Sequence, residues 1–240
     1  MGDLPYSTAG RGPLGGRTNQ PQVDHGTTNR QRSKPGLQCE DDLLLSISAY
    51  AMLQSARAMM DEQAQEIFDL WFSGEADDEV TFDSEEWGNY MRAEKHLQQQ
   101  IEARLTKHAE QLRDQSKGST HTVEGEIDLT FHAEVGGKYG GYWSGYNLLH
   151  GSNKEVGDFE LSGRFKAVRS HAPGGAYTVT YEKLEYVFND IADVNTRYSS
   201  DVGFARMAAN MASCLGSLPP KDYTLHVEWD AAAPIKIEVK

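Results

Sequence analysis

The hydrophobic pattern of the chain changes period at Lys117-Gly118-Ser119, and this change limits the possible folds more than any other feature. Before it, apolar residues recur at helical spacing. After it, from residue 123 to 131, apolar residues alternate with charged and polar ones. A period near 3.6 predicts amphipathic helices, and a period of 2 predicts half-buried strands. The sequence therefore predicts an α+β fold, with an N-terminal helical hairpin followed by a mostly antiparallel β-sheet or small barrel that contains one inserted helix.

The composition divides the chain of 240 residues into three regions. Residues 1–38 are rich in Gly, Pro, Asn and Gln and poor in large apolar groups, so we predict a disordered tail. Residues 39–117 carry the helical pattern and form the predicted hairpin. Residues 118–240 form the predicted β-rich domain, which carries the candidate site.

The helical pattern predicts two long helices, one over residues 43–74 and one over residues 84–116. The acidic segment between them, residues 75–86, lacks the central Gly and the ligand spacing of an EF-hand, so we expect a solvated loop. The most apolar stretch, residues 43–60, contains Arg57 and several Ser residues, which favours a buried bundle helix over a membrane span.

Alternating patterns and Gly- or Pro-rich turns predict the elements of the β-rich domain. We expect strands at residues 123–131, 142–149, 156–169, 176–188, 223–229 and 235–239. The Ala- and Met-rich residues 201–214 are expected to form the inserted helix, with Asp201 as a plausible N-cap.

The formal net charge of −13 argues against a nucleic-acid partner, because phosphate contacts need a clustered basic surface. Residues 1–35 contain no apolar core of the kind a cleaved signal peptide needs. We therefore expect synthesis in the cytoplasm, and we expect any export to depend on a signal other than a cleaved signal peptide.

The richest candidate site lies between residues 186 and 201, where a strand is expected to run into a helix. Asp190, Asp193 and Asp201 offer the hard oxygen ligands that Mg²⁺ or Ca²⁺ prefers. The planar guanidinium of Arg197 can donate two hydrogen bonds to a phosphate or carboxylate. Such a group suits phosphoester or pyrophosphate hydrolysis. The structural alternative is that these side chains cap a helix and close Asx-turns.

Two weaker candidates precede it. His150 is a candidate general base, since the pKa of imidazole lies near physiological pH, and its alternative role is a hydrogen bond that stabilises a turn. Trp143 belongs to an aromatic, Gly-rich cluster that suits a sugar ring or a lipid headgroup, although aromatic residues in strands more often pack in the core.

The segments Glu185-Tyr186-Val187-Phe188-Asn189-Asp190 and Lys221-Asp222-Tyr223, with Arg197 between them, are similar to the acid-and-tyrosine motif of the colicin-M-like antibacterial toxins. The chain also resembles that family in its order of flexible, helical and β-rich parts. The family cleaves the lipid-linked peptidoglycan precursor beside its pyrophosphate and uses a divalent cation. The resemblance implies Asp190 or Asp193 as the essential acid and Arg197 as the phosphate contact. The adjacent His-Arg pair of the family is missing here.

Our leading hypothesis is an antibacterial effector hydrolase that acts on a pyrophosphate-linked lipid intermediate of the cell envelope. The expected catalytic residues are Asp190, Asp193, Arg197 and His150. The expected substrate contacts are Tyr186, Asn189, Asn195 and Trp143, and the expected ligands of Mg²⁺ or Ca²⁺ are Asp190, Asp193 and Asp201.

Such an effector would be delivered to the periplasm of a target cell by a contact-dependent machine such as the type VI system. It would meet a lipid-linked or sugar-containing substrate, a cognate immunity protein and the secretion machinery. The first alternative is a non-enzymatic interaction protein whose helical hairpin binds a partner. The second is membrane permeabilisation through residues 43–60.

Overall fold

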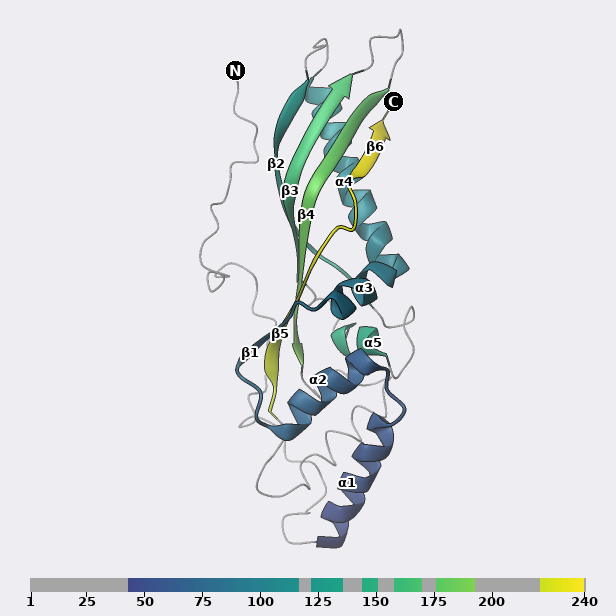
Figure 1. The fold of residues 1–240 in the computed structure, drawn as a ribbon, viewed down its shortest axis with the longest axis vertical. Helices are drawn as coiled ribbons and strands as arrows, with labels where there is room; N and C mark the ends of the chain where they lie inside the picture. The colour runs from purple at the N-terminus through teal and green to yellow at the C-terminus, as the bar shows by residue number, and fades with distance from the viewer. Residues whose placement is uncertain are drawn as a thin grey trace.

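The computed structural model describes residues 43–116, 122–135, 144–150, 158–169, 176–192 and 221–239. Over these residues the fold is α+β, as the sequence predicts, with helices packed along one face of a sheet (Figure 1). The sheet has two free ends in its strand order and does not close. The predicted alternative of a small barrel is therefore wrong.

The described helices are α1 (Leu43–Arg57), α2 (Glu62–Ser73), α3 (Glu85–Ala93), α4 (Lys95–Gln115) and α5 (Gly145–His150). The described strands are β1 (Glu79–Phe82), β2 (Val123–His132), β3 (Asp158–Arg169), β4 (Tyr177–Ala192), β5 (Tyr223–Asp230) and β6 (Ile235–Val239). Five of the six predicted strands are thus confirmed. The predicted helix at 201–214 lies outside the described residues.

The strands follow the order β1-β5-β4-β3-β2, and β6 also pairs with β4. The long strand β4 can pair with both, because β5 lies along its residues 185–192 and β6 along its residues 177–181. Among the described strands every pairing is antiparallel except that of β1 with β5, which is parallel. The prediction of a mostly antiparallel sheet is confirmed.

The two long helices of the predicted hairpin are each interrupted. The first ends at Arg57, and Asp61 starts α2 by accepting a hydrogen bond from the backbone N–H of Ala64 at 2.8 Å. The second breaks at Glu94, whose side chain accepts from the N–H of Leu97 and starts α4. A periodic pattern does not reveal these breaks, because the apolar stripe continues across them while side-chain caps restart the helix.

Two further predictions of local structure are wrong. The acidic segment 75–86 is not only a loop, because residues 79–82 form β1 and the N–H of Thr224 donates to the carbonyl of Asp78 at 2.9 Å. Part of the strand expected at 142–149 is helix α5. It begins at Gly145, where an added Cβ would lie 2.9 Å from Cβ of Gln63 in α2. The side-chain period of so short a segment does not separate helix from strand.

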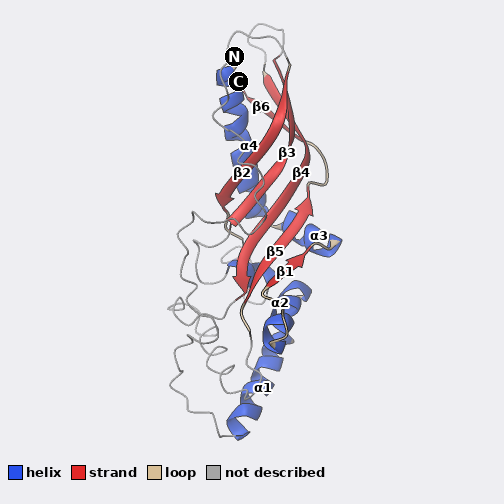
Figure 2. Ribbon diagram, turned by 90° about the vertical axis from the view of Figure 1, so that its left-hand side faces the viewer, coloured by secondary structure: helices blue, strands red, loops and turns tan. Residues whose placement is uncertain are grey.

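A bulge in β4, where it pairs with β3, divides the sheet into two halves. Lys183 has φ 51°, and the register shifts opposite it, next to Gly163. Before the bulge Tyr181 faces α4 and donates its hydroxyl to the carbonyl of Leu105 at 2.8 Å. After the bulge the buried side changes from odd to even residue numbers, so that Tyr186 packs against Trp229. Figure 2 shows β4 between β3 and β5 in the sheet.

The far end of the sheet is attached to α2. Trp71 donates its indole N–H to Asp222 at 3.0 Å, and Tyr223 donates its hydroxyl to the carbonyl of Ile67 at 3.2 Å. These bonds fix the start of β5 and therefore the strand end at which β4 also finishes.

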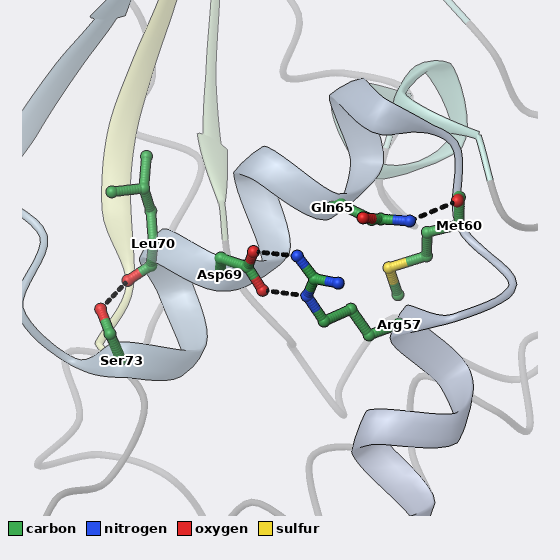
Figure 3. Close-up of polar contacts among 6 residues, drawn as sticks. All are labelled: Arg57, Met60, Gln65, Asp69, Leu70 and Ser73. Atoms are coloured by element: carbon green, nitrogen blue, oxygen red, sulfur yellow. Dashed lines mark hydrogen bonds and ion pairs between the residues drawn. The ribbon is translucent and has the colours of Figure 1, made fainter.

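Helix α1 packs less closely than the predicted buried bundle helix. Arg57 makes two contacts of 2.5 Å with Asp69, which join α1 to α2 (Figure 3). Leu53 is buried, but the side chains of Ile47 and Tyr50 are more than half exposed, at 55% and 52%. Within the described ranges, no helix combines the length and apolar character needed to cross a membrane.

Candidate functional site

Four polar residues form one row across four neighbouring strands. His132 of β2 lies opposite Asp158 of β3, Asp158 lies opposite Asn189 of β4, and Asn189 lies opposite His226 of β5. Side chains of successive strand residues point to opposite faces, so this row lies on the face opposite the buried Phe159. We call these four residues the polar ladder.

One end of the polar ladder is a histidine paired with a buried carboxylate. Nδ1 of His132 lies 3.0 Å from Oδ1 of Asp158. The His132 side chain is 60% exposed, whereas that of Asp158 is only 9% exposed. The contact is within ion-pair distance, but Oδ1 of Asp158 accepts no hydrogen bond from the imidazole, so the contact is one of charge. An exposed imidazole beside a buried carboxylate is a candidate general base.

The other end is an amide bound to a histidine. The Oδ1 atom of Asn189 contacts Nδ1 of His226. The Nδ2 atom of Asn189 donates to the carbonyl of Asp158 and to the carboxylate of Glu160, both at 3.4 Å. Asn189 is buried, and its side chain links the two histidine-bearing halves of the polar ladder. Its oxygen and nitrogen are both used within the protein, which favours a supporting role over the predicted substrate contact.

The other described residues of the predicted site lie on the opposite face. Asp190 follows Asn189 and therefore points to the helix-covered side, where it is buried and accepts from the N–H of Ile191 at 2.7 Å. Tyr186 lies in the hydrophobic core beside Phe159 and Trp229, and burial raises the pKa of its hydroxyl. Its surroundings favour packing over the predicted substrate contact.

The remaining predicted site residues are not brought together by the described structure. His150 is the last residue of α5, which packs against α2. Asp193, Asn195, Arg197, Asp201 and Trp143 lie outside the described residues. Across residues 43–116 and the other described ranges, no three His, Cys, Asp or Glu side chains are grouped as a metal site would require. The Mg²⁺ or Ca²⁺ site stays a prediction, and its described member, Asp190, faces the core.

Sequence reasoning missed His132, Asp158 and His226. They are 26 and 68 residues apart along the chain and match no spaced motif, so only the register of the strands brings them together. The available signal was weak. Each is a polar residue inside a strand or at its end, in a segment where polar and apolar residues alternate.

Comparisons with known proteins give little support for a family. No family model matches the chain, and no curated protein matches it. Among solved structures, the chain is similar to the bacteriocin syringacin M from Pseudomonas syringae pv. tomato DC3000, with a TM-score of 0.35 and 13% identity. The match covers 67% of this chain and 46% of that protein, so it spans less than half of the bacteriocin. A likeness this distant does not place the chain in a family.

Proposed function

We propose that this protein is an antibacterial effector hydrolase, and that the polar ladder is part of its active site. The observation that supports the proposal is the exposed imidazole of His132 beside the buried carboxylate of Asp158, with 3.0 Å between Nδ1 and Oδ1. Burying a carboxylate costs desolvation free energy. A negative charge placed beside an exposed imidazole supports a general base, because it stabilises the imidazolium that forms when the base accepts a proton.

In this proposal Nε2 of His132 accepts a proton from a water molecule whose oxygen bonds to phosphorus. The P–O bond to the leaving group then breaks, and its electron pair goes to the departing oxygen. The negative charge of Asp158 stabilises the imidazolium that forms. Removing one such proton acceptor costs about 10²–10⁴ in rate.

The proposed substrate is a pyrophosphate-linked lipid intermediate of peptidoglycan, as the resemblance to the colicin-M-like toxins implies. Asp193 and Arg197, which follow β4 in the sequence, remain the predicted acid and phosphate contact. A divalent cation would neutralise phosphate oxygens, but the described residues do not assemble its ligands, and the steps above involve only side chains of this protein. The proposed place of action is the periplasm of a target cell, with delivery by a secretion machine and protection by an immunity protein.

The test is growth of a bacterial host that produces the full chain in its cytoplasm or, through an added signal peptide, in its periplasm. The variants are Asp158→Asn, His132→Gln, Asp190→Asn and Asp193→Asn. The matched control is Glu124→Gln, which removes an exposed ion pair of 2.8 Å with Lys166 on the same two strands. Lysis limited to the periplasm, lost in Asp158→Asn and His132→Gln and kept in Glu124→Gln, is the expected result. Absence of toxicity in both compartments would overturn the proposal.

A second candidate function is partner binding by the helices, and one observation favours it. The exposed apolar side chains of Ile47, Tyr50 and Met59 lie in or just after α1. Replacing Ile47 and Tyr50 by Ser should abolish binding of a cognate partner and leave the polar ladder intact. Toxicity that survives this double change but disappears in Asp158→Asn would favour the enzyme.

A further inference from the structure

Strand β2 lies at one end of the strand order and pairs only with β3 among the described strands. In an antiparallel pair, every second residue turns its backbone N–H and C=O away from the partner strand. The other side of β2 therefore offers a line of hydrogen-bonding groups. Glu124, Glu126 and Asp128 alternate with residues that face the core, and all three are exposed. We call these three carboxylates and this side of β2 the acidic edge.

The cations nearest to the acidic edge come from β3. Lys166 lies opposite Glu124 and makes an exposed ion pair with it at 2.8 Å. Within the described ranges, no Lys or Arg side chain is within ion-pair distance of Glu126 or Asp128. A row of like charges along a strand edge favours a neighbouring strand that brings opposite charges at the same spacing.

The sequence contains a segment with this property at residues 29–35, Asn-Arg-Gln-Arg-Ser-Lys-Pro, which we call the basic segment. Arg30, Arg32 and Lys34 are two residues apart, so their side chains share one side of an extended chain. The acidic edge has the same spacing. All three charge pairs therefore form whether the strands run parallel or antiparallel, and Arg32 lies opposite Glu126 in both cases.

The basic segment is too close in sequence to α1 to reach the acidic edge of its own copy. Figures 1 and 2 show α1 extending away from the sheet, with α2 between α1 and the strands. Arg57, the last residue of α1, is joined to α2, so Leu43 is at the far end. The nine residues from Lys34 to Leu43 span at most about 32 Å. The length of α1 takes up about 22 Å of this, and the width of a packed helix such as α2 takes up about 10 Å.

We propose that the acidic edge of one copy of this protein binds the basic segment of a second copy, which adds as a strand beside β2. The backbone hydrogen bonds supply affinity, and the three charge pairs set the register. Whole copies repel each other, because each carries a formal net charge of −13. The contact therefore depends on local pairing of opposite charges, and it weakens as salt screens them.

The first test is the mass of the full wild-type chain in solution, measured by light scattering over a range of concentrations at low and at high salt. We expect association that grows with concentration and is weaker at high salt. Arg30→Glu/Arg32→Glu/Lys34→Glu, the segment-reversed variant, should associate about 10-fold more weakly or worse, because three attractive pairs become repulsive. A wild type that stays monomeric at every concentration would overturn the proposal without any variant having to fold.

The matched control for charge is Gln31→Arg/Arg32→Gln. This variant keeps the composition and net charge of the basic segment, but it moves the central cation to the other side of the extended chain. It should associate about threefold more weakly than the wild type, through loss of one charge pair. Unchanged association would show that net charge alone is responsible and would overturn the proposed register.

A mixing experiment identifies the two surfaces. Glu124→Lys/Glu126→Lys/Asp128→Lys, the edge-reversed variant, places three cations opposite the three cations of the basic segment. Neither this variant nor the segment-reversed variant should associate with itself. A mixture of the two should associate, because the reversed segment of one then meets the reversed edge of the other. A mixture of folded variants that stays monomeric would contradict the pairing of these two surfaces.

Disulfide trapping tests the central pair in a background where Cys39 and Cys214 are replaced by Ser. Opposite residues of neighbouring strands have Cα atoms about 5 Å apart, which is within the range of a disulfide. Chains with Arg32→Cys and chains with Glu126→Cys, mixed under mild oxidation, should form a linked pair. Arg17→Cys is the control, since Arg17 lies in the same N-terminal region but outside the basic segment. Equal trapping by Arg17→Cys and Arg32→Cys would overturn the proposed contact.

Discussion

His132 and Asp158 face each other across β2 and β3 with 3.0 Å between Nδ1 and Oδ1, and we expect them to act as one unit. Once the carboxylate is lost, nothing opposite His132 stabilises its imidazolium, so the effects of removing each residue should not add. The double variant His132→Gln/Asp158→Asn should be no more than about threefold less active than either single variant. The measurement is the rate of killing by each periplasmic protein at matched expression. Losses that multiply in the double variant would contradict a joint role.

Gly163→Ala should destabilise the protein by about 1–3 kcal/mol, because a Cβ at this position would lie 2.8 Å from the backbone carbonyl of Lys183. A backbone carbonyl in a paired strand has little freedom to move aside. Urea unfolding followed by circular dichroism measures the change. Gly88→Ala is a useful comparison, since its nearest atoms belong to the flexible side chain of Arg92, at 3.2 Å, and we expect a smaller loss there.

Asp61 joins three helices, so Asp61→Ala should cost more than removal of an ordinary cap. Its Oδ1 accepts from the N–H groups of Ala64 and Gly145 at 2.8 and 2.9 Å, and its Oδ2 accepts from the hydroxyl of Tyr90 at 2.7 Å. We expect a loss of about 3 kcal/mol, from one cap and two further hydrogen bonds.

The control for Asp61 is Ser84→Ala. Ser84 caps α3 through one hydrogen bond, from the N–H of Trp87 at 3.2 Å, and should cost about 1 kcal/mol. Thermal or urea unfolding compares the two variants. Equal losses would show that the contacts of Asp61 with Gly145 and Tyr90 contribute nothing.

The protein should lose stability as the pH falls below about 6.5, and His108 should account for part of the loss. Burial lowers the pKa of His108 from its usual 6.5. Because the folded state binds this proton less readily than the unfolded chain, the stabilisation is complete above pH 6.5 and is lost as the pH falls toward the folded pKa.

Thermal unfolding at pH 7.5 and pH 5.5 tests the role of His108. His108→Gln removes the titrating group and keeps a possible donor to the hydroxyl of Tyr181, which lies 3.0 Å from Nδ1 of His108. The drop in melting temperature between the two pH values should be a few degrees smaller in this variant. An unchanged drop would assign the acid sensitivity to other groups.

The strands were predictable and the site was not, for one physical reason. A strand with one buried face carries a repeating pattern, so Asp158 to Arg169 and Tyr223 to Asp230 could be recognised locally. The register between strands depends on packing over the whole sheet and on the bulge at Lys183, neither of which is local. The polar ladder exists only through that register.

The predicted run from Asn189 to Asp201 shows a related difficulty. Neighbouring residues in a strand point to opposite faces, so Asn189 joins the polar ladder while Asp190 turns to the helix-covered side. A cluster that is dense in sequence is divided in space once its first residues lie in a strand. The helix breaks at Asp61 and Glu94 were missed because the apolar period continues through a cap.

The parallel pairing of β1 with β5 means that the sheet is shared between distant parts of the chain, since Glu79 lies opposite Thr224. A cut between α4 and β2 would leave β1 on one fragment and the strands it completes on the other. Neither fragment then has the complete sheet, and β5 would expose the edge along which β1 pairs in the whole protein. Two such fragments produced together should associate and restore activity by complementation, whereas either fragment alone should stay inactive and prone to aggregation. If the whole protein is toxic, the two fragments would serve as a split reporter, in which cell death shows that the fragments have associated.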